Sequence, residues 1–174
     1  MLKKSIIATA VLAAFFLAYV ASEPDTFSVQ REVTIKASPE KVVVLIQDFR
    51  NWRTWSPWEG RDPAMLRSYI GADQGKGAAY AWAGNEQVGA GRMEITELHA
   101  ARVNIDLDFI RPLQSHNVAE FTLAPQGGST KVVWRMHGPS PFLAKLTGLF
   151  SSMERSVGKD FEAGLANMKA AAEK

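Results

Sequence analysis

The C-terminal segment, residues 151–174, constrains the fold more than any other part of the sequence. Its apolar residues recur at intervals of four, four, four and three positions, and this spacing places them on one face of an α-helix. About seven strand-like segments precede this helix, with little other long helix among them. Because a sheet is the only partner large enough to cover the apolar face, the sequence predicts one sheet packed against one helix. The residues of this face are Met153, Val157, Phe161, Leu165 and Met168.

Two further features concern the start and the packing of this helix. Ser151 and Glu154 form a capping-box pattern, which predicts that the helix begins at Ser151. Gly158 and Gly164 lie in its interior, where glycine costs about 1 kcal/mol relative to alanine. The missing side chains either leave space for a cavity or allow the helix to approach the sheet closely.

The segments before this helix alternate apolar and polar residues, as strands do. Phe27–Ile35 predicts the first strand, with Arg31 as the one charged residue on its apolar side. The Ser38-Pro39 pair predicts the start of a helix that runs to about Asp48, and Phe142–Phe150 predicts a short helix. The other strands are predicted near Leu66–Gly71, Ala78–Ala83, Gly89–Leu98, Arg102–Phe109, His116–Ala124 and Lys131–His137, with a hairpin turn at residues 126–129.

The first 22 residues differ in composition from the rest of the chain. Lys3 and Lys4 precede an uncharged run from Ser5 to Ser22 that is rich in Ile, Val, Leu, Phe and Ala. This pattern predicts either a membrane anchor or a cleaved signal peptide, and both place the domain outside the cytoplasm. We therefore expect residues 1–22 to be a targeting segment and residues 23–174 to be one domain. The expected location is the cell membrane with an extracytoplasmic domain, or the periplasm or exterior after cleavage.

Charge and composition exclude several classes of function. Lys3 and Lys4 account for the formal net charge of +2, so the remaining chain is neutral, which argues against binding of nucleic acid. The chain has no cysteine and therefore neither disulfides nor thiolate metal sites. The histidines, His99, His116 and His137, lie near strand ends without the spacing of metal ligands. Because no glycine-rich stretch opens a helix as phosphate loops do, we expect neither a metal nor a cofactor.

Four short motifs allow a more specific comparison. They are Asn51-Trp52 with Trp55-Ser56-Pro57-Trp58, residues 77–85 with 88–93, residues 130–134, and residues 158–162. Together they resemble one branch of the START/polyketide-cyclase (SRPBCC) superfamily, and the resemblance covers residues 27–172. Proteins of this branch often carry an N-terminal hydrophobic segment, as here.

The resemblance implies a helix-grip fold of the α+β class. In this fold a curved antiparallel sheet of about seven strands wraps round the long C-terminal helix, with an apolar cavity between them. It implies little about chemistry, because the superfamily includes lipid carriers, aromatase/cyclases and co-chaperones.

Aromatic residues are the main candidates for a binding site. Tyr80 and Trp82 share one face of a strand, and Trp55 and Trp58 are expected near the mouth of a cavity. Aromatic side chains in a domain of this size are usually core, but a sheet that grips a single helix also leaves a cleft for them to line. The candidate ligand-binding residues are Trp55, Trp58, Tyr80, Trp82, Glu86, Arg92, Phe109, Phe121, Trp134, Phe161 and Leu165.

Glu86 and Arg92 are the polar members of this set. They flank the turn between two glycine-rich strands and could meet across it. An exposed ion pair worth at most about 1 kcal/mol is the structural alternative to a polar anchor at the cavity mouth.

We expect the protein to bind a hydrophobic small molecule such as a lipid, an isoprenoid or an aromatic metabolite. A cyclase/aromatase-like enzyme that uses the same cavity is an alternative, and it would need a buried Asp, Glu, Arg or His inside the cavity. A co-chaperone-like partner-binding module is a third, and it would need an exposed apolar patch over a filled core. No catalytic residue is assigned.

Overall fold

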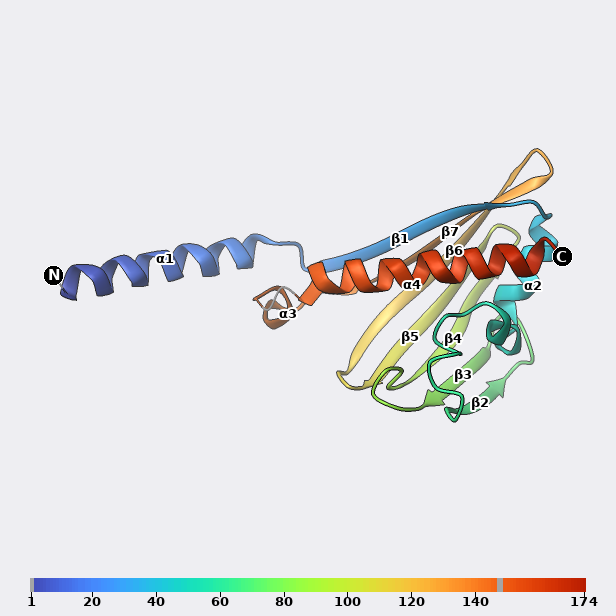
Figure 1. Cartoon of the computed structure of the whole chain (residues 1–174), viewed down its shortest axis with the longest axis horizontal. Helices are drawn as coiled ribbons and strands as arrows, with labels where there is room; N and C mark the ends of the chain where they lie inside the picture. Colours follow the sequence, from blue (N-terminus) through green and yellow to red (C-terminus); the bar gives the residue numbers. More distant parts are fainter. Residues whose placement is uncertain (1, 147–148) are drawn as a thin grey trace.

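One seven-stranded antiparallel sheet packs against the long C-terminal helix (Figure 1). The computed structural model describes residues 2–146 and 149–174. The strand order is β1-β7-β6-β5-β4-β3-β2, so only β1 joins the sheet away from its neighbour in sequence, by pairing with β7. The strands are β1 (Thr26–Ile35), β2 (Leu66–Gly71), β3 (Ala78–Ala83), β4 (Ala90–His99), β5 (Arg102–Arg111), β6 (Ser115–Gln126) and β7 (Ser129–Pro139), and the helices are α1 (Leu2–Ser22), α2 (Pro39–Gln47), the 3₁₀ helix η1 (Phe49–Thr54), α3 (Phe142–Leu146) and α4 (Leu149–Ala172).

The alternating pattern predicts these strands correctly because each strand has one face against the interior. In β5, Val103 and Ile105 are buried, whereas the intervening Asn104 is only half-buried. The turn between β6 and β7 forms at Gly127 and Gly128, which have φ angles of 53° and 84°. Glycine adopts such angles at little cost, so the predicted hairpin is confirmed. The helix-grip fold predicted from the sequence is also confirmed.

Helix α4 packs its apolar face on the sheet. Strand β1 contacts one side of this helix through a charged side chain. Phe161, Leu165 and Met168 are all buried, as the spacing predicts. Arg31 of β1 points to the same side of the sheet and reaches α4, where its guanidinium binds Glu162 Oε1 at 2.6 Å and Glu154 Oε1 at 3.1 Å. The one charged residue on the apolar side of β1 therefore joins the strand to the helix.

The predicted start of this helix is wrong. Helix α4 begins at Leu149, so Ser151 lies within its first turn and cannot be the N-cap. The capping-box pattern fails because residues 149–151 contain no helix breaker and Glu154 is engaged by Arg31 instead. The short helix predicted for Phe142–Phe150 is shorter than expected, since α3 ends at Leu146 and Leu149 already belongs to α4; residues 147–148 lie outside the described residues.

The N-terminal segment forms α1, which extends away from the sheet in Figure 1. Within the described part of the chain, no helix combines the length and the apolar character that crossing a membrane requires. The predicted targeting run includes residues 5, 6 and 8, whose side chains lie outside the described ones.

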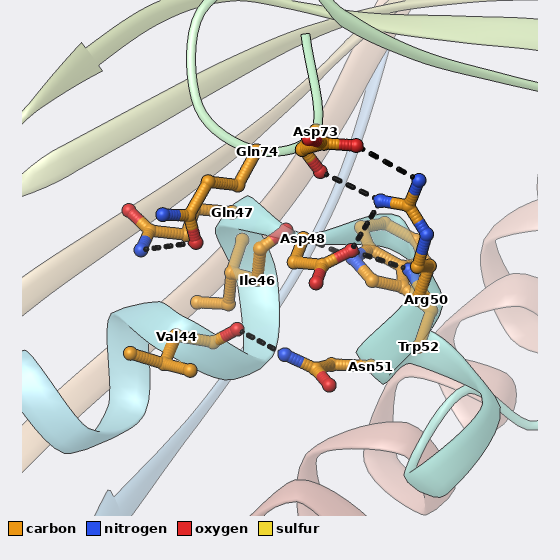
Figure 2. A network of polar contacts seen from close by, with 9 residues as sticks. All are labelled: Val44, Ile46, Gln47, Asp48, Arg50, Asn51, Trp52, Asp73 and Gln74. Atoms are coloured by element: carbon orange, nitrogen blue, oxygen red, sulfur yellow. Dashed lines mark hydrogen bonds and ion pairs between the residues drawn. The ribbon is translucent and has the colours of Figure 1, made fainter. Parts of the chain in front are cut away.

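The tryptophan-rich motif is fixed in place by the end of α2 (Figure 2). Trp52 Nε1 donates to the Ile46 carbonyl at 2.9 Å, and Asn51 Nδ2 donates to the Val44 carbonyl at 2.8 Å. The last carbonyls of a helix lack partners within the helix, so these side chains complete its C-terminus. Much of this motif is therefore structural.

The 3₁₀ helix η1 also contacts the loop between β2 and β3, through Arg50. The guanidinium of Arg50 binds the carbonyl and the carboxylate of Asp73 at 3.0 and 3.1 Å, as Figure 2 shows. Arg50 also lies over the ring of Tyr69, with its guanidinium carbon 5.1 Å from the ring centroid. These contacts fix the segment that leads from η1 into the wall of the cavity described below.

Candidate functional site

A cavity of about 260 Å³ lies between the inner face of the sheet and the first half of α4. Strands β3 to β7 supply its walls because their inward positions converge on this space, and α4 closes it with Val157 and Phe161. The apolar lining consists of Trp52, Trp58, Met65, Tyr80, Trp82, Val88, Met93, Leu107, Phe109, Pro112, Ala119, Trp134, Met136, Val157 and Phe161, together with Gly89.

Ring contacts hold the aromatic walls in place. Trp134 stacks on Phe161 with centroids 3.9 Å apart and an interplanar angle of 7°. At the other side of the cavity, Trp82 meets Phe109 edge-on at 5.9 Å, and Tyr80 stacks on Trp82 at 6.0 Å. Offset and edge-on pairs of this kind add to the stability gained from burial, so the cavity walls are largely preformed.

Seven of the residues predicted to bind a ligand line this cavity. Their binding role stays a prediction, but the structure brings them together from β3, β5, β7, α4 and two loops. They are Trp58, Tyr80, Trp82, Glu86, Phe109, Trp134 and Phe161.

The other four candidates do not line the cavity. Trp55 and Phe121 are buried in the hydrophobic core beside the cavity. Trp55 Nε1 donates to the Leu45 carbonyl at 2.8 Å. Leu165 is buried one turn beyond Phe161, towards the C-terminal end of α4. Arg92 lies on the outer face of β4, because its neighbour Met93 points inward and side chains alternate along a strand. These four residues lie close in sequence to residues of the lining or on the same face of an element, but they are not part of the lining.

The expected pair between Glu86 and Arg92 is also absent from the described residues. Arg92 instead forms an ion pair with Glu94 on the same outer face. Residues i and i+2 of a strand point to the same side, so this partner is the nearer one. Glu86 remains in the cavity lining, on the loop between β3 and β4.

The two glycines of α4 allow close approach and do not leave space for a cavity. A Cβ atom at Gly158 would lie 2.0 Å from Nη2 of Arg31, and one at Gly164 would lie 2.9 Å from Cζ3 of Trp134. Neither glycine contributes to the cavity lining. Of the two interpretations drawn from the sequence, tight packing of helix on sheet is the correct one.

A polar cluster in the cavity wall was not predicted from the sequence. Glu59, which lies on the loop after η1, lines the cavity together with Tyr80. Its Oε2 accepts from Nε of Arg67 at 2.8 Å, and its Oε1 accepts from the hydroxyl of Tyr80 at 2.8 Å. The Glu59 and Arg67 side chains are only 9 % and 13 % exposed, so the ion pair is largely shielded from water.

The electrostatics of this cluster act on Tyr80 and Arg67. Burial, followed by the hydrogen bond to Glu59, raises the pKa of Tyr80 far above its ordinary value, so its hydroxyl keeps its proton. The hydrogen bond to Glu59 also raises the pKa of Arg67. No periodic pattern marks Glu59, since it lies in an irregular loop; its position directly after Trp58 was the only available signal.

Asp62 joins the loop that carries Glu59 to the loop at the cavity mouth. Its Oδ1 accepts from the Ala64 amide at 3.1 Å, and its Oδ2 accepts from the Asn85 amide at 2.7 Å. Gly84 is needed at this junction, because a Cβ atom there would lie 2.6 Å from Oδ2 of Asp62. The buried carboxylate thus sets the position of both loops relative to the walls.

The mouth of the cavity carries three further polar groups. Glu86 and Gln87 come from the loop between β3 and β4, and Arg111 comes from the end of β5. Among the ion pairs of the described residues, none involves Glu86 or Arg111. The cavity is thus mostly apolar inside, with Ser56, Glu59 and Tyr80 as polar groups in its wall and one charged group of each sign at its entrance.

Several solved structures share this fold. Protein CV1439 from Chromobacterium violaceum matches with a TM-score of 0.59 and 16% identity, over 87% of this chain and 99% of its own. The hypothetical protein jhp0584 from Helicobacter pylori matches with a TM-score of 0.64 and 15% identity, over 87% and 90%. Ara h 8.0201 matches with a TM-score of 0.59 and 11% identity, over 84% and 97%. At these identities the likeness shows the fold alone.

No curated protein matches the chain in sequence. A family model does match, over residues 26–173. This span runs from the first residue of β1 to the residue after α4 and includes every element that lines the cavity. It also covers the four motifs on which the resemblance was based, so that resemblance is confirmed. The chain belongs to the family described as polyketide cyclase / dehydrase and lipid transport.

Proposed function

We propose that this protein binds a hydrophobic small molecule in the cavity between the sheet and α4. The observation that supports this proposal is the cavity itself, about 260 Å³ in volume and lined mainly by apolar residues, most of which are aromatic or methionine. Binding sites for small molecules are typically concave and mostly apolar, with a few polar groups that orient the ligand. Glu59, Tyr80 and the groups at the mouth fit that description. The family's description, which includes lipid transport, agrees with an apolar ligand.

The volume and the walls indicate the size of the ligand. An apolar cavity of about 150 Å³ accepts a benzene molecule, so a cavity of about 260 Å³ accommodates roughly two fused rings or a short branched chain. The aromatic rings of Trp82 and Phe109 in the cavity walls favour a planar ring system over a flexible chain. A neutral naphthalene derivative is therefore a suitable first probe.

Substitution of Ala119 by leucine tests whether the cavity is the binding site. Ala119 lines the cavity from β6, where its small side chain leaves room. Ala119→Leu should weaken binding of 1-naphthylamine, a fluorescent two-ring probe, by about tenfold or more, because the added carbons occupy the space of the probe. Probe fluorescence, titrated against wild-type and variant protein, gives the two dissociation constants.

The matched control is Val118→Leu, one position earlier on the opposite face of β6. It enlarges a side chain outside the cavity and should leave the dissociation constant unchanged. Equal binding by wild-type protein and Ala119→Leu would place the probe elsewhere and contradict the proposal. Absence of saturable binding to the wild-type protein would contradict it as well.

A cyclase-like enzyme is the second candidate function, and one observation favours it. An enzyme of this kind needs a buried acidic or basic group in the cavity, and Glu59 is a largely buried acidic group there. A co-chaperone-like module is less favoured, because it called for a filled core and the domain instead contains a cavity. Turnover of a bound ligand, followed by mass spectrometry of the ligand, distinguishes an enzyme from a carrier.

We also propose that the N-terminal segment places the domain on the extracytoplasmic side, as an anchored or a released protein. The support comes from Lys3 and Lys4 before the uncharged run. The mouth loops lie at the end of the sheet where β1 begins, which is the end nearest this segment. An anchored domain would therefore present its mouth towards the membrane.

Protease accessibility tests this location. Protease added to cells with a permeabilised outer layer should digest the domain while a cytoplasmic marker protein stays intact. A domain as protected as the marker would contradict the proposal. A soluble form that begins near Glu23 would favour cleavage over anchoring.

A further inference from the structure

The polar cluster of Glu59, Arg67 and Tyr80 has a specific consequence for what the cavity can bind. Glu59 and Tyr80 face the cavity, whereas Arg67 lies behind Glu59 on β2 and does not line it. The carboxylate is 2.8 Å from both the Arg67 Nε atom and the Tyr80 hydroxyl. Its charge is therefore compensated within the wall before any ligand arrives.

The donors of this cluster point away from the cavity or to one another. Nε of Arg67 donates to Glu59, its Nη1 donates to the Met65 carbonyl at 2.6 Å, and its Nη2 donates to the Glu59 carbonyl at 3.3 Å. The single proton of the Tyr80 hydroxyl goes to Glu59. A carboxylate has about four acceptor sites and a phenol oxygen has two. The groups that Glu59 and Tyr80 can still offer to the cavity are therefore acceptors.

We propose that Glu59 and Tyr80 bind a neutral hydrogen-bond donor of the ligand, so that the cavity selects apolar ring compounds that carry a hydroxyl group. This inference rests on the proposed function. An anionic ligand group would meet only acceptors at this point and would be repelled. A cationic ligand group would be buried close to Arg67, which already neutralises the carboxylate. The cost of removing that cationic group from water would therefore not be compensated.

A pair of probes with the same ring and nearly the same size isolates the hydroxyl. They are 2-naphthol and 2-methylnaphthalene, and equilibrium dialysis against the full-length protein gives both dissociation constants. The measured quantity is the preference, defined as the ratio of the dissociation constant of 2-methylnaphthalene to that of 2-naphthol. Comparison of this ratio between proteins cancels the difference in hydration of the two probes.

The main variant replaces both members of the buried ion pair, Glu59→Met with Arg67→Met. Removing the pair together avoids leaving one buried charge without a partner, which would threaten the fold. The preference for 2-naphthol should fall by about tenfold, because a hydrogen bond to a carboxylate is lost for this probe alone. Glu59→Gln with Arg67→Gln, which removes both charges and keeps polar side chains at the two positions, should lower the preference by several-fold and provides a second test if the first double variant does not fold.

The control is the double variant Arg92→Met with Glu94→Met, which removes an ion pair from the outer face of β4. It should keep the wild-type preference. A preference that is unchanged in a folded variant lacking both charges, whether the methionine pair or the glutamine pair, would overturn this inference and leave the proposed function intact. Failure of both probes to bind the wild-type protein would overturn the proposed function and the inference with it.

Discussion

Replacing Trp134 with alanine is expected to lower the free energy of unfolding by about 3–5 kcal/mol, the range typical of large aromatic deletions in cores. Trp134 is 2 % exposed and lies at the centre of the aromatic cluster. Its ring stacks on Phe161 and Phe121 and is met edge-on by the rings of Trp52, Trp55 and Trp58. Loss of this ring removes contacts from three parts of the chain at once and enlarges the existing cavity.

Urea unfolding followed by circular dichroism measures this loss, with a slope that should not change if the variant unfolds cooperatively. Trp58→Ala is the matched control, because Trp58 is only partly buried and meets Trp134 and Phe161 edge-on. Its loss of stability should be clearly smaller. A loss below about 1 kcal/mol for Trp134→Ala would show that the ring is not a main support of the core.

The strands and the closing helix were predictable from the sequence because burial imposes a period on them. Val103 and Ile105 of β5 mark the inner face by alternation, and Phe161 and Leu165 of α4 mark it by helical spacing. The exact helix start was less predictable. A capping pattern contributes only about 1 kcal/mol, so Arg31, which is distant in sequence, could engage Glu154 without any local signal.

The cavity was predictable in part, for a related reason. Tyr80, Trp82 and Trp134 were placed correctly because they share inward positions of strands. The assignment of Arg92 failed although the same alternation, applied from Met93, puts it outside. Glu59 could not be found, because an irregular loop has no period and its partners Arg67 and Tyr80 come from two different strands. Residues that a loop brings to a site depend on tertiary contacts, which a single sequence does not display.

Substitutions at the interior glycines of α4 test how closely this helix packs against the sheet. Gly164→Leu is expected to lower the free energy of unfolding by about 1–3 kcal/mol, even though leucine favours a helix more than glycine does. A Cβ atom at this position would lie 2.9 Å from Cζ3 of Trp134 and 3.2 Å from Cδ of Pro57. Trp134 cannot move aside, since Phe161 is stacked on its face. The larger side chain must therefore displace the helix from the sheet.

Ala166→Leu serves as the matched control, because Ala166 is exposed on the same helix and has room for a larger side chain. Its stability should stay within about 0.5 kcal/mol of the wild type. Gly158→Ala should be tolerated better than Gly164→Ala, since the atom that it meets is the far end of the Arg31 side chain, which is partly exposed and can shift. Chemical unfolding of the four variants gives the comparison. A Gly164→Leu protein as stable as the wild type would mean that space exists beneath α4 at this position, and the cavity would then extend further along the helix than its lining residues indicate.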